Sequence, residues 1–277
     1  MGMVGRRSMR RGVLAAVAVF VAVASAGCAG SSATPPIIYI TPAPRTLGPG
    51  ETPTPGPPPP AITNAIVSPT APDSRWTVVF KMPVIGGVSA STAKKMNDAI
   101  TARVNAYVSA FTSRPLPAVQ SGGKPSTLEG NYTIALNSST LVSLRFSVLT
   151  QVAGAAATLG EAPTVGEAGS INFTVSTGAT IDLSDVFTSA AAALPIITAK
   201  TKDSLSRQLG SALSWPAGSL PMSFFDKAWA FTKDGLEFTW SQGAIASANA
   251  GPPSAVVAWA DIKSVIKVDG PAGEVIR

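Results

Sequence analysis

Residues 169–187 read GSINFTVSTGATIDLSDVF, and this segment carries most of the evidence for the fold. Ile171, Phe173 and Val175 alternate with polar residues, which is the period of a strand with one buried face. Gly178 follows a threonine and tolerates positive φ, so a tight turn is expected there. The first half of the stretch therefore predicts a half-buried strand that ends in a turn.

Beyond that turn, Ile181 and Leu183 resume a short apolar segment. Ser184 is expected to cap the turn or helix that follows, because its hydroxyl can accept from free main-chain N–H groups. Outward from this point, alternation predicts further strands, a Lys233-Asp234-Gly235 hairpin turn and three helices. The expected strands are 76–84, 132–136, 141–152, 229–232, 236–240 and 255–259; the expected helices run from Ser89 or Ser91 to Thr112, from Leu194 or Pro195 to Leu209, and from 261 to 267.

These elements predict an α+β fold, with an antiparallel or mixed β-sheet and about three helices packed on it. We expect the folded domain to span residues 75–277. The Pro- and Gly-containing loop at 113–129 is a candidate boundary between two smaller lobes.

The first 27 residues have the plan of a secretory signal peptide, with a basic start, an apolar run and small residues at the end. The apolar run is short for a stable membrane-spanning helix. Arg10 and Arg11 also resemble the twin-arginine export signal, so two export routes stay open.

Ser25-Ala26-Gly27-Cys28 resembles the bacterial lipobox. This resemblance implies that Cys28 is lipidated and anchors the mature protein to the outer face of the cell membrane. Ala24-Ser25-Ala26 is a competing cleavage site, which would release a secreted protein that starts at Gly27.

Residues 28–74 are rich in Pro and Thr and are expected to form a disordered stalk. Proline fixes φ and removes main-chain donors, which favours extended polyproline II conformations. The stalk would act as a semi-rigid spacer between the membrane and the domain.

Three stretches resemble one known family: 177–187, with T-G and I-D-L-S-D-V-F; 231–238, with F-T-K-D-G-L-E-F; and 256–266. They are similar to the RsiV C-terminal-like family, domain of unknown function 3298. The resemblance implies an α+β domain that binds a protein or a cell-wall component. Some relatives are esterases, so the resemblance also leaves an enzyme open. The family has a histidine-containing loop where this chain reads Ala153-Gly-Ala-Ala-Ala157, so no role of that histidine carries over.

The composition excludes several chemistries. The chain has no histidine and one cysteine, which excludes a Ser-His-Asp triad, imidazole metal ligands and an intrachain disulfide. Four arginines and no acid precede Cys28, so removal of the leader lowers the net charge from +6 to +2. Such a weakly charged protein is a poor nucleic-acid binder.

No residue is predicted to be catalytic or to bind a cofactor or a metal. Asp182 and Asp185 are interpreted as turn and helix-start acids. Asp234 and Glu237 are interpreted as solvent-facing residues beside the hairpin turn. Without a histidine, a serine nucleophile would need a lysine base, and the lysines of the second expected helix fit a solvated face equally well.

The aromatic residues of the last third are expected to pack in the core. The alternative is an aromatic-lined groove, rimmed by the loops at 151–168 and 241–254. The first functional hypothesis is a non-catalytic binding domain for an envelope protein or glycan. An envelope esterase or hydrolase and a lipid-carrying lipoprotein are the alternatives.

Overall fold

The computed structural model of the chain describes residues 56–119, 123–153 and 164–276. The predicted signal peptide at 1–27, the lipidation site Cys28 and the stalk up to residue 55 lie outside the described residues. Within the described ranges, no helix has the length and apolar character that crossing a membrane requires.

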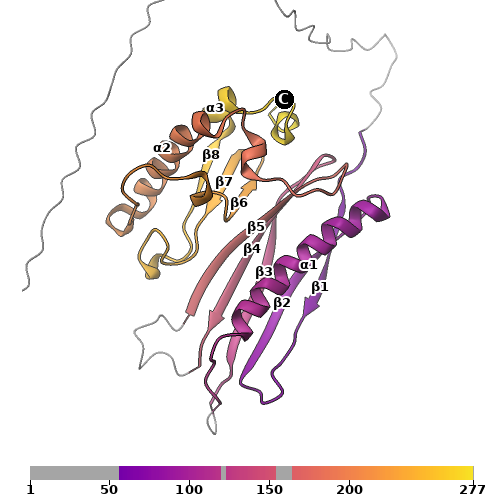
Figure 1. The fold of residues 1–277 in the computed structure, drawn as a ribbon, viewed down its shortest axis with the longest axis vertical. Helices are drawn as coiled ribbons and strands as arrows, with labels where there is room; N and C mark the ends of the chain where they lie inside the picture. The colour runs from indigo at the N-terminus through magenta and orange to yellow at the C-terminus, as the bar shows by residue number, and fades with distance from the viewer. Residues whose placement is uncertain (1–55, 120–122, 154–163, 277) are drawn as a thin grey trace, which may run out of the picture. The chain divides into compact units, whose positions relative to one another are not determined.

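The first layer is a five-stranded sheet whose spatial order equals its chain order (Figure 1). β2 and β3 are parallel and every other neighbouring pair is antiparallel. The strands are β1 (Ala61–Val67), β2 (Trp76–Gly86), β3 (Ser126–Asn137), β4 (Leu141–Gln151) and β5 (Thr164–Thr174).

Helix α1 (Ala90–Thr112) connects β2 to β3 and covers one face of this sheet (Figure 1). Ser89 caps it, because its hydroxyl accepts from the N–H of Thr92 at 3.2 Å. Met96, Ile100 and Val104 recur every fourth residue and are fully buried, as the apolar spacing predicts. The helix and the sheet therefore share one apolar core.

The second layer is a three-stranded antiparallel sheet with helix α2 (Ala190–Leu209) packed against it. The Asp-Gly hairpin is confirmed, since β6 (Trp229–Phe231) pairs with β7 (Gly235–Thr239). β8 (Ser254–Ala258) follows on the other side of β7, and the short helix α3 (Trp259–Ile262) starts directly after it. The aromatic residues of the last third, Trp229 and Trp240 among them, belong to the core of this layer, which confirms the packing interpretation.

Several predicted boundaries are wrong. Ala61–Val67 form β1 although they lie in the predicted stalk, because seven main-chain pairs with β2 outweigh the proline-rich surroundings. β2 runs past Pro83 to Gly86, since its pairing with β3 ends at Phe80 and a proline is tolerated on a one-sided ladder. β5 begins at Thr164, inside the predicted loop at 151–168.

The second helix also begins earlier than expected. Its N-cap is Ser189, whose hydroxyl accepts from the N–H of Ala192 at 3.4 Å. A run of alanines fills the first turn, so Pro195 lies in the second turn rather than the first. Ser184 caps nothing: it lies inside a short 3₁₀ turn at Leu183–Val186, whose N-cap is Asp182.

The predicted lobe boundary at 113–129 is wrong as well. That segment joins α1 to β3 within a single layer. The two hydrophobic clusters divide after β5 instead, since the first ends at Phe173 and the second contains Ile181 and nearly all the later buried residues. Leu141 of β4 belongs to the second cluster, so the first sheet contributes to both cores.

Candidate functional site: the groove on the open sheet face

The face of the first sheet that turns away from α1 carries the candidate site. Along β4, Leu144, Phe146 and Val148 are buried on the helix side, whereas the residues between them are more exposed. Arg145 and Ser147 therefore point to the open face. This alternation places one arginine among small polar and aliphatic residues.

A polar contact joins one end of this face to the second layer. Asn172 donates its amide to the carbonyl of Trp229 at 3.0 Å, and Ser170 accepts from the N–H of Trp229 at 2.9 Å. Ser143 accepts from the N–H of Phe231 at 3.0 Å. These three side chains pair with the edge strand β6 as a neighbouring strand would. We call Ser143, Ser170 and Asn172 the polar seam.

The outer edge of β5 is also covered. Gly166 exchanges two hydrogen bonds with Gln242, since its carbonyl accepts from the Gln242 main chain and its N–H donates to the Gln242 side chain, both at 2.8 Å. The N–H of Ala168 donates to the hydroxyl of Ser241 at 3.1 Å. The segment after β7 thus closes the strand edge and forms one wall of a groove.

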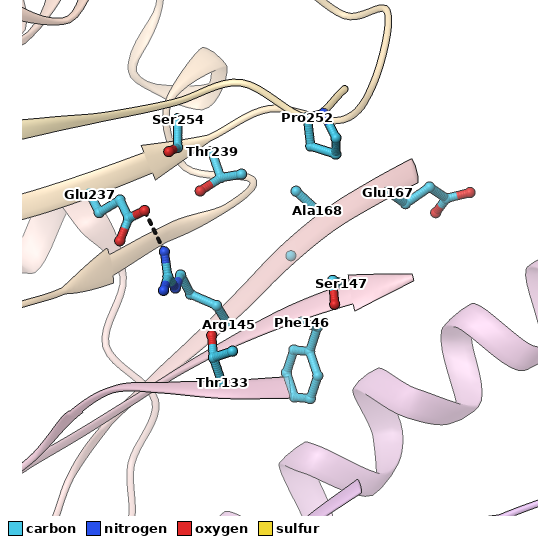
Figure 2. A pocket seen from close by; sticks show the side chains of 11 residues that line it. Thr133, Arg145, Phe146, Ser147, Glu167, Ala168, Glu237, Thr239, Pro252 and Ser254 are labelled. Atoms are coloured by element: carbon cyan, nitrogen blue, oxygen red, sulfur yellow. Dashed lines mark hydrogen bonds and ion pairs between the residues drawn. The ribbon is translucent and has the colours of Figure 1, made fainter. Parts of the chain in front are cut away.

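Arg145 and Glu237 form an ion pair from β4 to β7 (Figure 2). The expectation that Glu237 faces solvent is wrong: its side chain is 11% exposed, against 35% for Arg145. Arg145 uses Nη1 for this bond, and its buried Nε has no hydrogen-bond partner among the described residues. The Glu237 carboxylate thus holds the Arg145 guanidinium in place, and most of the N–H donors of Arg145 are not used in this bond.

A cavity of about 240 Å³ lies beside this pair (Figure 2). Hydroxyl groups surround it on both layers, from Thr133 and Ser147 on the first sheet and from Thr239 and Ser254 on the second. Phe146 reaches it from β4 with its ring turned to the α1 side (Figure 2). The cavity is therefore a small site rich in hydrogen-bonding groups.

A second cavity of about 620 Å³ continues along the open sheet face. Ser147, Glu167 and Pro252 line both cavities. The second one is more apolar, because it contains exposed aliphatic side chains from three strands. They are Ile66 of β1, Val79 of β2 and Leu149 of β4, which are 64%, 51% and 44% exposed. We call the two cavities together the sheet groove.

The charges around the sheet groove balance. Lys81 and Arg145 oppose Glu129, Glu167 and Glu237 in its lining. Arg114 adds the third positive charge, since its guanidinium lies 3.4 Å from the carboxylate of Glu167. With Arg114 counted, the charges in and beside the groove sum to zero.

Asp182 and Asp185 lie in the turn where the sequence places them. Asp185 accepts from the main-chain N–H of Asp182 at 3.2 Å and closes a capping turn. Lys200, considered as a base, forms an ion pair with Asp261 at 2.6 Å. Across the described residues, no group of three or more Cys, Asp or Glu side chains has the arrangement of a metal site.

The groove was only partly foreseeable. Residues 166–168 line it, together with Gln242, Pro252 and Ser254, and all of them lie in the loops considered as the rim of the alternative, aromatic-lined groove. That alternative is wrong in its lining, because the aromatic rings of the last third pack in the second core. Sequence reasoning missed Arg145 and the aliphatic residues of the open face. The alternation in β4 contained the signal for Arg145, since it lies between two core residues.

Comparison with known proteins identifies one family. Residues 184–260 match the model of a family described as protein of unknown function (DUF3298). This match confirms the resemblance to that family over the second layer; the finer likeness to RsiV stays a prediction. No curated protein matches the chain.

The solved structures that are similar to this chain include two members of that family. A DUF3298 family protein from Pseudomonas aeruginosa has a TM-score of 0.52 and 12% identity, over 76% of this chain and 95% of that one. A member of the family from Bacteroides fragilis has a TM-score of 0.49 and 12% identity, over 79% and 97%. At this identity the Pseudomonas structure shows the fold alone, and it agrees with the α+β architecture found here.

Proposed function

We propose that this chain, whose residues 184–260 match the DUF3298 family, is an exported lipoprotein that binds an envelope protein or cell-wall ligand in its sheet groove. The leader pattern at 1–27 and the lipobox-like Ser25–Cys28 support export and anchoring. In this proposal Cys28 holds the protein on the outer face of the membrane. Cleavage before Gly27 would release it instead.

One observation carries the binding role: three large aliphatic side chains stay exposed beside a cavity rich in polar groups. Burial of exposed apolar surface is favourable at about 25 cal/mol per Å². Ligand sites combine such an apolar lining with a few polar groups that fix orientation. The sheet groove has both features. Ile66, Val79 and Leu149 supply the apolar lining of the larger cavity. Arg145 and Glu237 supply polar groups in the smaller cavity.

Site-specific photo-crosslinking in whole bacteria tests this role. The full chain would carry a photoreactive amino acid in place of Val79, and a control chain would carry it in place of Val256. Val256 is an equally suitable position, because it is 44% exposed on β8 in the other layer. We expect an adduct with an envelope component from position 79 and none from position 256.

Identical adducts from the two positions, or no adduct from position 79, would contradict the binding role. Mass spectrometry of the adduct distinguishes a protein from a glycan. An esterase would show itself differently, by hydrolysis of short-chain esters that a single Ser→Ala change abolishes.

A further inference from the structure

We propose that the sheet groove binds an extended, uncharged peptide segment of a partner protein. Main-chain amide groups of this segment would lie at the Arg145–Glu237 pair, and its apolar side chains would lie on Ile66, Val79 and Leu149. The inference rests on the proposed function and names the class of ligand for the same groove.

The first argument comes from the hydrogen-bonding capacity of the ion pair. A guanidinium has five N–H donors, and Arg145 donates from Nη1 to Oε1 of Glu237. Among the described residues this ion pair is made through Nη1 and Oε1, and the buried Nε of Arg145 has no hydrogen-bond partner. Both side chains line the smaller cavity. A donor and an acceptor side by side match the C=O and N–H of a peptide group.

The second argument is electrostatic. Glu237 neutralises Arg145, and the remaining charges of the groove also balance. A neutral site gives no net attraction to an acidic or basic polymer, and a charged ligand group would lose its hydration without gaining a counter-ion. The balance therefore favours an uncharged ligand.

The third argument is the order of polar and apolar groups along the groove. Residues shared by the two cavities, Ser147 among them, connect the polar part with the aliphatic part. In an extended peptide, alternate side chains point to the same side. Such a segment can direct every second side chain onto Val79 and Leu149 while its main chain reaches Arg145. Aliphatic surface is matched better by apolar side chains than by the hydroxyl groups of a glycan.

Selection from a phage-displayed library of random decapeptides tests the proposal with the purified full chain. We expect the enriched peptides to be uncharged, with apolar residues at every second position. A synthetic copy of an enriched peptide then serves as the probe in a titration with variants of the chain.

Glu237→Gln gives the sharpest variant, because it leaves the positive charge of Arg145 without its partner and keeps the side-chain shape. We expect it to weaken binding of the uncharged probe by about tenfold or more and to shift a repeated selection to peptides with Asp or Glu. Ser147→Trp is the second variant: Ser147 is exposed, so the bulky ring blocks the passage between the cavities without disturbing the core. Val256→Asp is the control and should leave the affinity unchanged.

Acidic or basic peptides enriched by the unaltered chain would overturn the proposal, as would an unchanged affinity in Ser147→Trp. If Glu237→Gln does not fold, as its thermal unfolding would reveal, Ser147→Trp decides. A glycan adduct at position 79 without peptide enrichment would overturn the peptide ligand and leave the proposed binding role intact. Absence of both the adduct and the enrichment would remove both proposals.

Discussion

The side-chain amide of Asn172 donates a 3.0 Å hydrogen bond to the main-chain carbonyl of Trp229, and this bond joins the two layers. Asn172 is buried and also accepts from the hydroxyl of Ser143 at 2.5 Å. One side chain thus satisfies a polar group on each sheet. Because a buried polar group without a partner is costly, the orientation of the layers is coupled to this residue.

We therefore predict that Asn172→Leu lowers the free energy of unfolding by about 1–3 kcal/mol, because it removes the donor to the carbonyl of Trp229 and the acceptor of the Ser143 hydroxyl proton. Urea unfolding of the full chain measures the loss. Asn105→Leu is the control, since Asn105 is exposed on α1 and should change stability by no more than about 0.5 kcal/mol. Equal losses of unfolding free energy in the two variants would contradict a stabilising role of the polar seam.

A second prediction concerns Gly169, which lies in β5. A Cβ on Gly169 would lie 1.8 Å from the hydroxyl oxygen of Tyr107 and 3.1 Å from the ring carbon that bears it. We expect Gly169→Ala to destabilise the protein by about 1–3 kcal/mol. Gly86→Ala is the control, because no atom lies within 4 Å of a Cβ there.

The double variant Gly169→Ala with Tyr107→Phe tests the cause. Removal of the hydroxyl removes the closest atom, so we expect the double variant to lose less stability than the sum of the single variants, by about 1 kcal/mol. Strict additivity would show that the hydroxyl of Tyr107 is not what excludes a side chain at position 169.

Tyr107 also gives a pH-dependent prediction. Burial raises the pKa of Tyr107 above its ordinary value of 10.0, and nearby Arg103 opposes this shift. Above pH 10 the unfolded chain releases this proton first, so the folded state loses stability as the pH rises from 10 towards the raised pKa. Below pH 10 the stability that Tyr107 contributes through its raised pKa is fully present. We expect Tyr107→Phe to show a smaller loss of stability between pH 9.5 and 11 than the unaltered chain, measured by urea unfolding; parallel curves would contradict it.

The fourth prediction concerns the anchor. Metabolic labelling with a palmitate analogue should label the full chain at Cys28, and Cys28→Ala should abolish the label and move the protein from the membrane fraction to the medium. No label on the unaltered chain would favour cleavage before Gly27. Full-length, uncleaved protein in the cytosol would contradict export altogether.

Local sequence patterns predicted most of the elements, because strand alternation and helix spacing depend on near neighbours. Ile171 and Phe173 do lie on the core side of β5, and the hairpin turns at the Asp-Gly pair. β1 escaped prediction because it is a short segment between proline-rich stretches, and its strand conformation is stabilised by pairing with β2 later in the chain.

The site depended on longer-range information. Glu237 was assigned to solvent because it follows a turn, yet it lies under Arg145, which is 92 residues earlier in the chain. The exposure of Val79 and Leu149 likewise depends on which sheet face α1 covers, and no local pattern specifies that choice. The neutral, half-aliphatic groove is therefore a property of the assembled layers.

The agreement between chain order and strand order has a consequence for biogenesis. All the members of the first hydrophobic cluster lie before residue 176, so a polypeptide that emerges amino end first has that core complete while the rest is still to come. The second core needs Leu141, which the finished sheet already holds in place. The earlier layer can thus serve as the template on which the later one assembles, and until Gln242 arrives the edge of β5 is the surface that a folding helper would have to shield.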